Sequence, residues 1–201
     1  TASGEGSWWG RDAYNKVSGL PAGKTWAQLS AGRSHTCGVT TSGEGRCWGE
    51  DAYNKVSGLP AGKTWAQLSA GGFHTCGVTT SGEGRCWGDD SDNQVSGLPA
   101  GKTWAQLSAG YRHTCGVTTS GEGRCWGGDS DNQVSGLPAG KTWAHLSTGR
   151  VHTCGVTTSG EGRCWGDDSY NQVSGLPAGK TWAQLSAGLS QAGGVATSGD
   201  G

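Results

Sequence analysis

The sequence of 201 residues has few large hydrophobic side chains: methionine is absent, phenylalanine occurs once, and hydrophobic residues make up 32% of the chain. No stretch approaches the roughly 18 consecutive apolar residues of a membrane-spanning helix, so we expect no membrane as a partner. The beginning of the chain also lacks a charged segment followed by an apolar one, as expected of a mature or trimmed chain.

An excess of charge of one sign is lacking as well. Lysine and arginine (15) nearly balance aspartate and glutamate (16), the net charge is −1, and no basic block occurs. This balance argues against a phosphate-binding surface and against nucleic acid as a partner. No Ser-His-Asp set, phosphate-binding loop or isolated carboxylate pair stands out, so we expect neither an enzyme nor a cofactor.

Glycine, tryptophan and cysteine are abundant instead, with 40, 11 and 8 residues. The glycines have no Gly-X-Y period, which excludes a collagen-like chain. Disordered chains contain few aromatic residues, so the sequence predicts a folded protein. Its core must be thin and consist mainly of tryptophan, valine and leucine.

The dipeptide Trp-Gly recurs with a step of 39 residues. Its tryptophans are Trp9, Trp48, Trp87, Trp126 and Trp165. The tripeptide Thr-Trp-Ala recurs with the same step, around Trp26, Trp65, Trp104, Trp143 and Trp182. Residues 196–201 return to the register of residues 1–6, so the chain starts and stops at the same point of a repeat.

Each repeat predicts short strands separated by turns. In the first complete copy we expect strands at residues 26–30, 35–41 and 46–48, and a short fourth strand at 54–57. Three or four antiparallel strands per repeat predict one all-β domain, residues 1–201, folded as a five-bladed β-propeller. We expect residues 193–197 to pair with residues 7–9 and close the ring; an open solenoid is the alternative.

The cysteines form four equal pairs on either side of a Thr-Thr-Ser-Gly turn. The pairs are Cys37/Cys47, Cys76/Cys86, Cys115/Cys125 and Cys154/Cys164. In the fifth copy Gly193 and Trp8 stand at these positions, so both cysteines are missing together, as a bond between them predicts. We therefore expect four disulfides and a secreted, extracellular protein. Zinc bound by His35, Cys37 and Cys47, and by the equivalent residues, is the alternative.

The pattern Trp-x-x-Leu-x-Ala-Gly-x-x-His-Thr, followed by Thr-x-x-Gly and Cys-Trp-Gly-x-Asp, resembles the repeat of the regulator of chromosome condensation superfamily. The run from Trp87 to Gln94 is similar to the propeller-type β-lactamase inhibitor proteins of bacteria. The resemblance implies a propeller, although those relatives have seven blades, and in the inhibitor proteins it implies target binding through loops.

The resemblance also implies a structural role for the histidine of the repeat, hydrogen-bonded to backbone near the ring centre. This histidine is present in four copies, as His35, His74, His113 and His152. His145 replaces the glutamine of the other copies, and we expect it to be a surface exchange.

The five copies differ from one another mainly at two places: the dipeptide before the histidine position and the loop after Trp-Gly. Because antiparallel strands run alternately up and down, both places lie on one face. Aromatic and arginine residues, which are enriched at binding surfaces, occur there. We expect a ligand-binding face made of Arg33, Phe73, Tyr111, Arg112, Arg150, Tyr14, Tyr53, Asp92, Asp131 and Tyr170. Drift in tolerant loops is the alternative explanation.

The sequence thus predicts a non-catalytic, secreted, monomeric protein that binds a protein partner through the variable loops. One alternative is a lectin with up to five carbohydrate sites between near-identical blades. Another is a designed or consensus scaffold without a natural ligand. Asp90 with Asp92, and Asp129 with Asp131, offer carboxylates to calcium, but a solvated acidic loop is the favoured interpretation and no metal is expected.

Overall fold

The computed structural model describes residues 5–7 and 9–197, which form five antiparallel sheets. The strands are β1 (Trp26–Ala31), β2 (His35–Thr40), β3 (Gly45–Gly49), β4 (Trp65–Ala70), β5 (His74–Thr79), β6 (Gly84–Gly88), β7 (Trp104–Ala109), β8 (His113–Thr118), β9 (Gly123–Gly127), β10 (Trp143–Thr148), β11 (His152–Thr157), β12 (Gly162–Gly166), β13 (Trp182–Ala187) and β14 (Ala192–Ala196). Four sheets contain three consecutive strands, and the fifth contains only β13 and β14.

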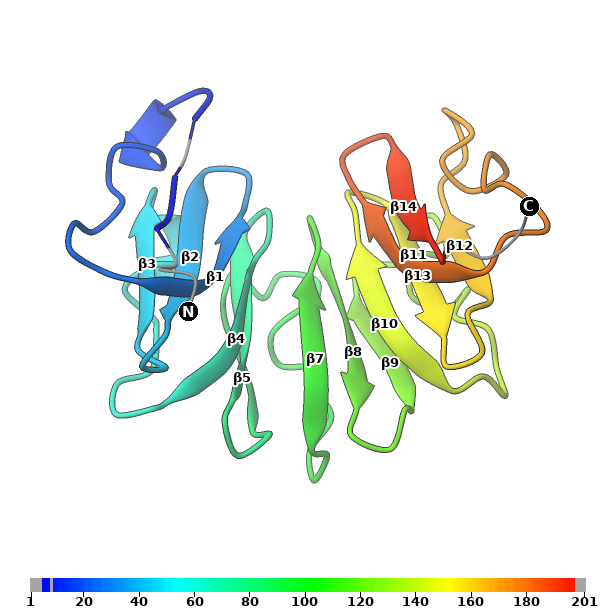
Figure 1. Ribbon diagram of the computed structural model, residues 1–201, viewed down its shortest axis with the longest axis horizontal. Coiled ribbons are helices and arrows are strands. Elements are labelled where there is room, and N and C mark those ends of the chain that lie inside the picture. The colour runs from blue at the N-terminus through cyan, green and yellow to red at the C-terminus, as the bar shows by residue number, and fades with distance from the viewer. Residues whose placement is uncertain (1–4, 8, 198–201) are drawn as a thin grey trace.

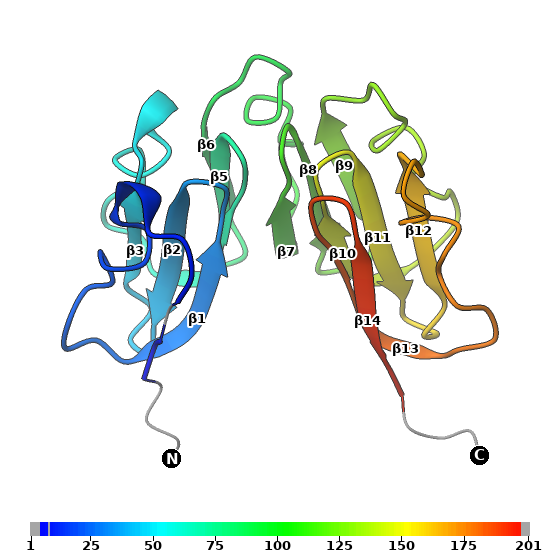
Figure 2. The ribbon, with the colours of Figure 1, turned by 90° about the horizontal axis from the view of Figure 1, so that it is seen from above.

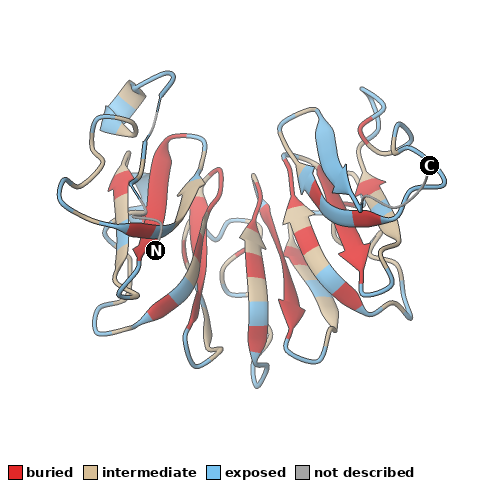
Figure 3. Cartoon of the chain, in the orientation of Figure 1, coloured by how far each residue is buried: buried red, intermediate tan, exposed pale blue. Residues whose placement is uncertain are grey.

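The middle strand of each three-stranded sheet is buried along its whole length, because it lies between two strands of its own sheet and packs on the first strand of the next sheet (Figure 3). In the first sheet, Gly38 of β2 lies against the ring of Trp26 and the side chain of Leu29. A Cβ atom at Gly38 would come within 2.6 Å of both side chains, so only glycine fits here. The local sequence His-Thr-Cys-Gly-Val-Thr thus combines β-branched residues, which favour a strand, with a glycine against which the side chains of the neighbouring strand pack.

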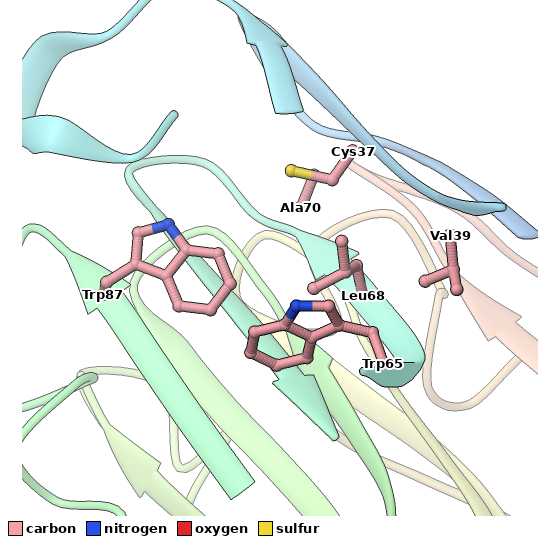
Figure 4. Packing of buried hydrophobic residues seen from close by; sticks show 6 residues of the cluster. All are labelled: Cys37, Val39, Trp65, Leu68, Ala70 and Trp87. Carbon is pink, nitrogen blue, oxygen red and sulfur yellow. The ribbon is translucent and has the colours of Figure 1, made fainter. Parts of the chain in front are cut away.

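The hydrophobic core lies between consecutive sheets rather than within any one of them. Cys37 and Val39 of β2 pack against Trp65 and Leu68 of β4, with Trp87 of β6 completing the cluster (Figure 4). The same arrangement recurs at the next three junctions. Each sheet therefore depends on its neighbour for burial of its apolar side chains.

Side-chain hydrogen bonds join the inner strands of neighbouring sheets. The Gln28 side-chain oxygen accepts a hydrogen bond from the Leu68 amide at 2.9 Å, and Ser30 Oγ accepts one from the Ala70 amide at 3.0 Å. His145 holds the glutamine position at the last junction and is half-buried there rather than on the open surface.

The five sheets follow one another around an arc, with β1, β4, β7, β10 and β13 in succession along its inner side (Figures 1 and 2). The arc is open between the first and the fifth sheet in both views. The predicted pairing of residues 193–197 with residues 7–9 is not formed among the described residues, and Trp8 lies outside them. Five sheets turn through less than a full circle here, so the two ends do not meet.

The predicted fourth strand at residues 54–57 is replaced by a short 3₁₀ helix, η2 (Ala52–Asn54), and a turn; η1 (Ala13–Asn15) is its counterpart before the first sheet. Tyr53 and Asn54 have φ angles of 64° and 58°, in the left-handed region, which an extended strand excludes. The Asp51 carboxylate holds this turn by accepting hydrogen bonds from the amides of Val56 and Ser57 at 2.8 and 2.9 Å.

Candidate binding face

The two variable segments of each repeat meet on one edge of the arc, as the strand directions predict. The amide of Glu50, in the loop after β3, donates to the Ser34 carbonyl, in the β1–β2 connection, at 2.9 Å. Asp89 and Phe73 are joined in the same way at 3.0 Å. We call this edge the variable-loop face; it consists of residues 11–16, 33–34, 50–55, 72–73, 89–94, 111–112, 128–133, 150–151, 167–172 and 189–190.

Aspartates fix the backbone of the loops after the third strands. Asp168, like Asp51, accepts hydrogen bonds from two amides further along its loop, those of Val173 and Ser174. Hydrogen bonding from Ser174, followed by that from Val173, lowers the pKa of the Asp168 carboxyl. The backbone of these loops is thus defined locally, while the side chains between the fixed points are free to vary.

Six of the predicted binding residues form one connected cluster on the variable-loop face. This aromatic–arginine cluster consists of Arg33, Tyr53, Phe73, Tyr111, Arg112 and Arg150. The half-buried Phe73 ring is at its centre, 6.1 Å from the Tyr53 ring and 4.9 Å from the Tyr111 ring, both edge-on.

Arginines lie against the aromatic rings of the cluster. The Arg33 guanidinium lies 5.3 Å from the centre of the Phe73 ring and 5.5 Å from that of Tyr111. Arg112 lies 4.9 Å from the Phe73 ring, and Arg150 lies 5.6 Å from the Tyr111 ring. These distances are within the range of cation–π attraction, so exposed guanidinium groups are held in place before any ligand binds.

A hollow of about 370 Å³ opens beside the cluster, at the inner edge of the sheets. Lys16, Arg33 and Arg150 line it together with Tyr111, and none of its lining residues is acidic. Backbone hydrogen bonds between consecutive sheets form its wall, such as that from the Arg33 amide to the Gly71 carbonyl at 3.2 Å. The hollow therefore offers positive charge and aromatic surface to a ligand.

The other four predicted binding residues lie outside the cluster. Asp92 forms an ion pair with Arg112 at 2.9 Å, so it neutralises one cluster arginine. Tyr14 lines a second hollow of about 420 Å³ that also includes Tyr53. Asp131 accepts a hydrogen bond from Ser130, and Tyr170 lines a groove on the fifth sheet.

A buried lysine on this face was not predicted. Lys55 is 1% exposed, and its ammonium group donates to Glu50 Oε2 at 2.6 Å and to Ser34 Oγ at 2.9 Å. Ser34 Oγ in turn donates to Glu50 Oε2, and the hydrogen bond from Lys55, followed by that from Ser34, lowers the pKa of the Glu50 carboxyl. The signal in the sequence is that lysine stands where three later copies have glutamine, with glutamate five residues earlier.

Three of the four repeat histidines, His35, His74 and His113, form hydrogen bonds to threonine side chains of the next sheet, not to backbone as expected; among the described residues, His152 forms no such bond. His35 Nε2 lies 2.8 Å from Thr75 Oγ1, and Thr75 Oγ1 itself donates to the Lys55 carbonyl at 2.8 Å. Because the single hydroxyl proton is used in the second bond, His35 must donate from Nε2 in the first. Burial lowers the pKa of His35 and His113 to about 3 and that of His74 to about 4, so these rings are neutral.

All eight cysteines are paired in disulfides that link the second and third strands of the first four sheets. The bonds are Cys37–Cys47, Cys76–Cys86, Cys115–Cys125 and Cys154–Cys164, which confirms the prediction of four disulfides.

The two cysteines of a pair are not equivalent, which the equal pairs of the sequence did not predict. Each second-strand cysteine is fully buried between sheets. The third-strand cysteines are only half-buried; they are Cys47, Cys86, Cys125 and Cys164. The physical reason is their position, because the third strand forms the outer edge of its sheet. None of the eight cysteines belongs to the variable-loop face.

Metal binding finds no support in these groups. The disulfide sulfurs are unavailable as thiolate ligands for zinc. Calcium binding is not supported either, because the Asp90 carboxylate accepts hydrogen bonds from two backbone amides and Asp92 forms an ion pair with Arg112. Among the described residues, no group of three or more potential metal ligands occurs.

Residues 26–54, 65–94 and 104–133 match the regulator of chromosome condensation (RCC1) repeat. No curated protein matches the chain. The matched segments coincide with the first three sheets and the loops that follow them, which confirms the resemblance seen in the sequence for this part of the chain.

Two receptor ectodomains are similar to the chain in structure and sequence. The ectodomain of the Physcomitrella patens receptor kinase CR4 is 26% identical, with a TM-score of 0.74 over 94% of this chain and 52% of the ectodomain chain. The CRINKLY WD40 ectodomain of the Arabidopsis thaliana receptor kinase ACR4 is 28% identical, with a TM-score of 0.61 over 72% of this chain and 51% of the other. The chain thus spans about half the length of these structures.

Prp20p from Saccharomyces cerevisiae shares the fold, at 15% identity and a TM-score of 0.74, over 92% of this chain and 61% of Prp20p. The finer resemblance to the β-lactamase inhibitor proteins stays a prediction. The described residues contain no helix long and apolar enough to cross a membrane.

Four disulfides and similarity to receptor ectodomains indicate an extracellular protein. The chain is an all-β repeat protein in which three segments match the RCC1 repeat, and its fold is similar to those of the CR4 ectodomain and Prp20p.

Proposed function

We propose that this chain is a secreted, non-catalytic binding protein that recognises a protein partner through the variable-loop face. The observation that carries the proposal is the aromatic–arginine cluster, in which exposed arginines lie on aromatic rings beside a hollow. Aromatic and arginine side chains are the residue types that most often dominate the energy of protein–protein interfaces.

The cluster is arranged for binding at low entropic cost. The disulfides and the aspartate-held loops fix the backbone beneath the cluster, and the aromatic rings restrain the guanidinium groups. Ordering a flexible side chain on binding costs about 0.5–1.5 kcal/mol, so restraint before binding increases affinity. A surface formed only by drift in loops would not be expected to bring one type of contact together across four sheets.

The charge of the hollow selects the chemistry of the partner. Arg112 is neutralised by Asp92, whereas Arg33, Arg150 and Lys16 surround the hollow without an acidic residue in its lining. A partner that places an aspartate or glutamate in the hollow, with an apolar side chain against Phe73 and Tyr111, would match both features. Binding should then weaken as salt concentration rises.

The comparisons support a binding role without naming the partner. Two of the similar structures are ectodomains of receptor kinases, and the Prp20p structure is described with its binding to Gsp1p and histones. From these structures we infer only that similar propellers serve as binding domains.

The proposal is tested by screening the immobilised chain against a library of secreted proteins and ectodomains, with a glycan array alongside. A genuine protein partner should lose most of its affinity to the double variant Arg33→Ala, Arg150→Ala. The matched control is Lys63→Ala with Lys102→Ala, because these lysines pair with Glu83 and Glu122 at the opposite edge. Partners that respond only to the control, or saturable glycan binding without any protein partner, would overturn the proposal.

A further inference from the structure

The second hollow of the variable-loop face, of about 420 Å³, lies between the first two variable loops. These two loops share the sequence Ala-Tyr-Asn-Lys, at residues 13–16 and 52–55, and the other three copies of the repeat carry a different sequence there. The volume is within the range of pockets that bind small organic molecules. A hollow between the two loops that share a sequence is therefore a candidate site for a ligand of its own.

The backbone of both loops adopts a conformation that is rare for tyrosine. Tyr14 and Tyr53 each have a φ angle of 64°, in the left-handed region, whereas Tyr170 at the same position of the fifth copy lies outside this region. Residues in such strained conformations are concentrated at functional sites. Both side chains line the hollow and are 61% and 58% exposed, so their rings form its mouth.

Hydrogen bonds to the first sheet hold the loop at residues 11–16 in place. The Lys16 carbonyl accepts hydrogen bonds from Trp48 Nε1 at 3.0 Å and from Thr36 Oγ1 at 3.1 Å. The Lys55 carbonyl is bound in the same way by the second sheet. Both walls of the hollow are therefore positioned by complete sheets before any ligand binds.

The lining of the hollow carries an excess of positive charge. Arg11, Lys16 and Arg33 belong to it, and Glu50 is the one acidic residue among the described residues that line it. The Glu50 carboxylate is already paired with the ammonium group of Lys55. The loops after β6, β9 and β12 contain two or three aspartates each and no basic residue. The second hollow is thus a basic place in an otherwise acidic set of loops, and it suits an anionic ligand.

The floor of the hollow contains a charged hydrogen-bond donor. The buried Lys55 ammonium group donates to Glu50 Oε2 and Ser34 Oγ. An ammonium group has three N–H donors, and the described residues provide no acceptor for the third. In the third copy, Gln94 with Asp89 replaces the lysine and glutamate, so that floor has no cation. An oxygen atom of a ligand at the floor of the second hollow would accept the third hydrogen bond of Lys55.

We propose that the second hollow binds a uronic acid unit, the carboxylated sugar of acidic polysaccharides. Arg11 and Arg33 supply guanidinium groups, whose shape matches a carboxylate. The Tyr14 and Tyr53 rings offer flat surfaces to the C–H groups of the sugar ring, and a sugar hydroxyl accepts from Lys55. An aromatic acid of similar size has no hydroxyl groups for this floor. Because these features occur together at one place, one site per chain is expected, not the five sites of the lectin alternative.

The site is tested by calorimetric titration of the chain with glucuronic acid and with glucose, in which a neutral CH₂OH group replaces the carboxylate. We expect glucuronic acid to saturate one site per chain and glucose to bind about tenfold more weakly or less, as the loss of charge-assisted hydrogen bonds predicts. Benzoic acid provides a carboxylate on an aromatic ring. Absence of glucuronic acid binding, or equal affinities for glucuronic and benzoic acid, would overturn the proposal.

A charge reversal locates the site. Arg11→Glu introduces the residue that the second copy carries as Glu50, so the fold should tolerate it, and the affinity for glucuronic acid should fall about tenfold or more at unchanged Tm. The matched control is Arg150→Glu, because Arg150 lines the first hollow and not the second. This control should leave glucuronic acid binding unchanged and weaken a protein partner, so failure of this proposal and failure of the proposed function are distinguishable. Equal effects of the two variants on glucuronic acid binding would show that the second hollow is not the site.

A second variant separates binding from folding. Tyr14→Gly removes one ring at the mouth and accommodates the left-handed φ angle without strain. The affinity for glucuronic acid should fall roughly fivefold, the order expected of one aromatic contact, while Tm does not decrease. An unchanged affinity would contradict the predicted contact between the sugar ring and Tyr14.

Discussion

The second and fifth sheets have the same sequence in their first strand and share a Gly-Val pair in their second, but they differ in how they are buried. Val78 of β5 is 2% exposed, and its counterpart Val195 of β14 is 61% exposed. The difference lies in the neighbours: β5 has a sheet beyond it and β6 beside it, while β14 has neither among the described residues. Burial in this fold is thus a property of the junction between sheets, not of the single repeat.

The sequence of the fifth copy differs at the positions that make these junctions. Gln191 stands at the histidine position and Ala192 at that of Thr75, so the hydrogen-bond chain from histidine to threonine stops there. Gly193 stands at the cysteine position. The residues that lock one sheet to the next are therefore present in four copies and absent together in the fifth.

The largest expected effect comes from removing the disulfides that distinguish the first four sheets from the fifth. Each bridge closes a loop of about 11 residues and stabilises the fold by roughly 2.5–3 kcal/mol through loop-closure entropy. Four bridges together amount to roughly 10 kcal/mol, comparable with the whole stability of a typical domain. We expect the fully reduced chain to be unfolded at 25 °C by circular dichroism, with eight thiols found by alkylation and mass spectrometry. An unchanged urea midpoint after complete reduction would contradict this expectation.

A single methyl group at Gly116 should have the next largest effect. Its Cβ would come within 2.6 Å of Leu107 Cδ2 and Trp104 Cζ3, inside a complete junction. We expect Gly116→Ala to lower the free energy of unfolding by about 3 kcal/mol, as overpacked cores do. The control is Gly193→Ala, which meets open space in the fifth sheet. Urea unfolding of both variants measures the two losses of unfolding free energy. Equal losses would mean that the two sheets are packed alike.

Acid should weaken the junctions that contain histidine. The folded-state pKa of His113 is lowered to about 3 and that of His74 to about 4 by burial, below the value of about 6.5 in the unfolded chain. As pH falls below about 6.5, the unfolded state takes up protons that the folded state refuses, so stability decreases until the folded pKa is reached.

Each buried histidine should contribute a loss of roughly 1.4 kcal/mol per pH unit within that window. His113→Gln places at this junction the residue that the fifth copy carries. The free energy of unfolding of this variant should therefore fall less steeply with decreasing pH than that of the unaltered chain. Between pH 6 and pH 4.5, the two slopes should differ by about 1 kcal/mol per pH unit. Chemical unfolding at a series of pH values measures the slope, and identical slopes for both proteins would show that His113 is protonated without cost.

How much of this the sequence predicts depends on whether a feature repeats. The strands, the disulfides and the face that carries Phe73 and Tyr111 follow from the 39-residue period and its variations. Ring closure does not, because it depends on the angle between neighbouring sheets, which no local sequence pattern encodes. The buried Lys55 was missed because it depends on a pairing with Glu50 that occurs in one copy only.

The smallest expected effect on stability, and the one that separates binding from folding, concerns the variable dipeptides. Phe73 and Tyr111 stand where other copies carry Ser34 or Leu189, so no junction requires an aromatic ring there. Phe73→Ala with Tyr111→Ala should shift the free energy of unfolding by less than about 1 kcal/mol, as surface-loop changes do. The same double variant should weaken partner binding about 30-fold, which corresponds to roughly 2 kcal/mol. Calorimetry for Tm and surface plasmon resonance for Kd test the two halves separately. If Tm collapses while Kd is unchanged, the cluster serves the fold and the binding surface lies elsewhere.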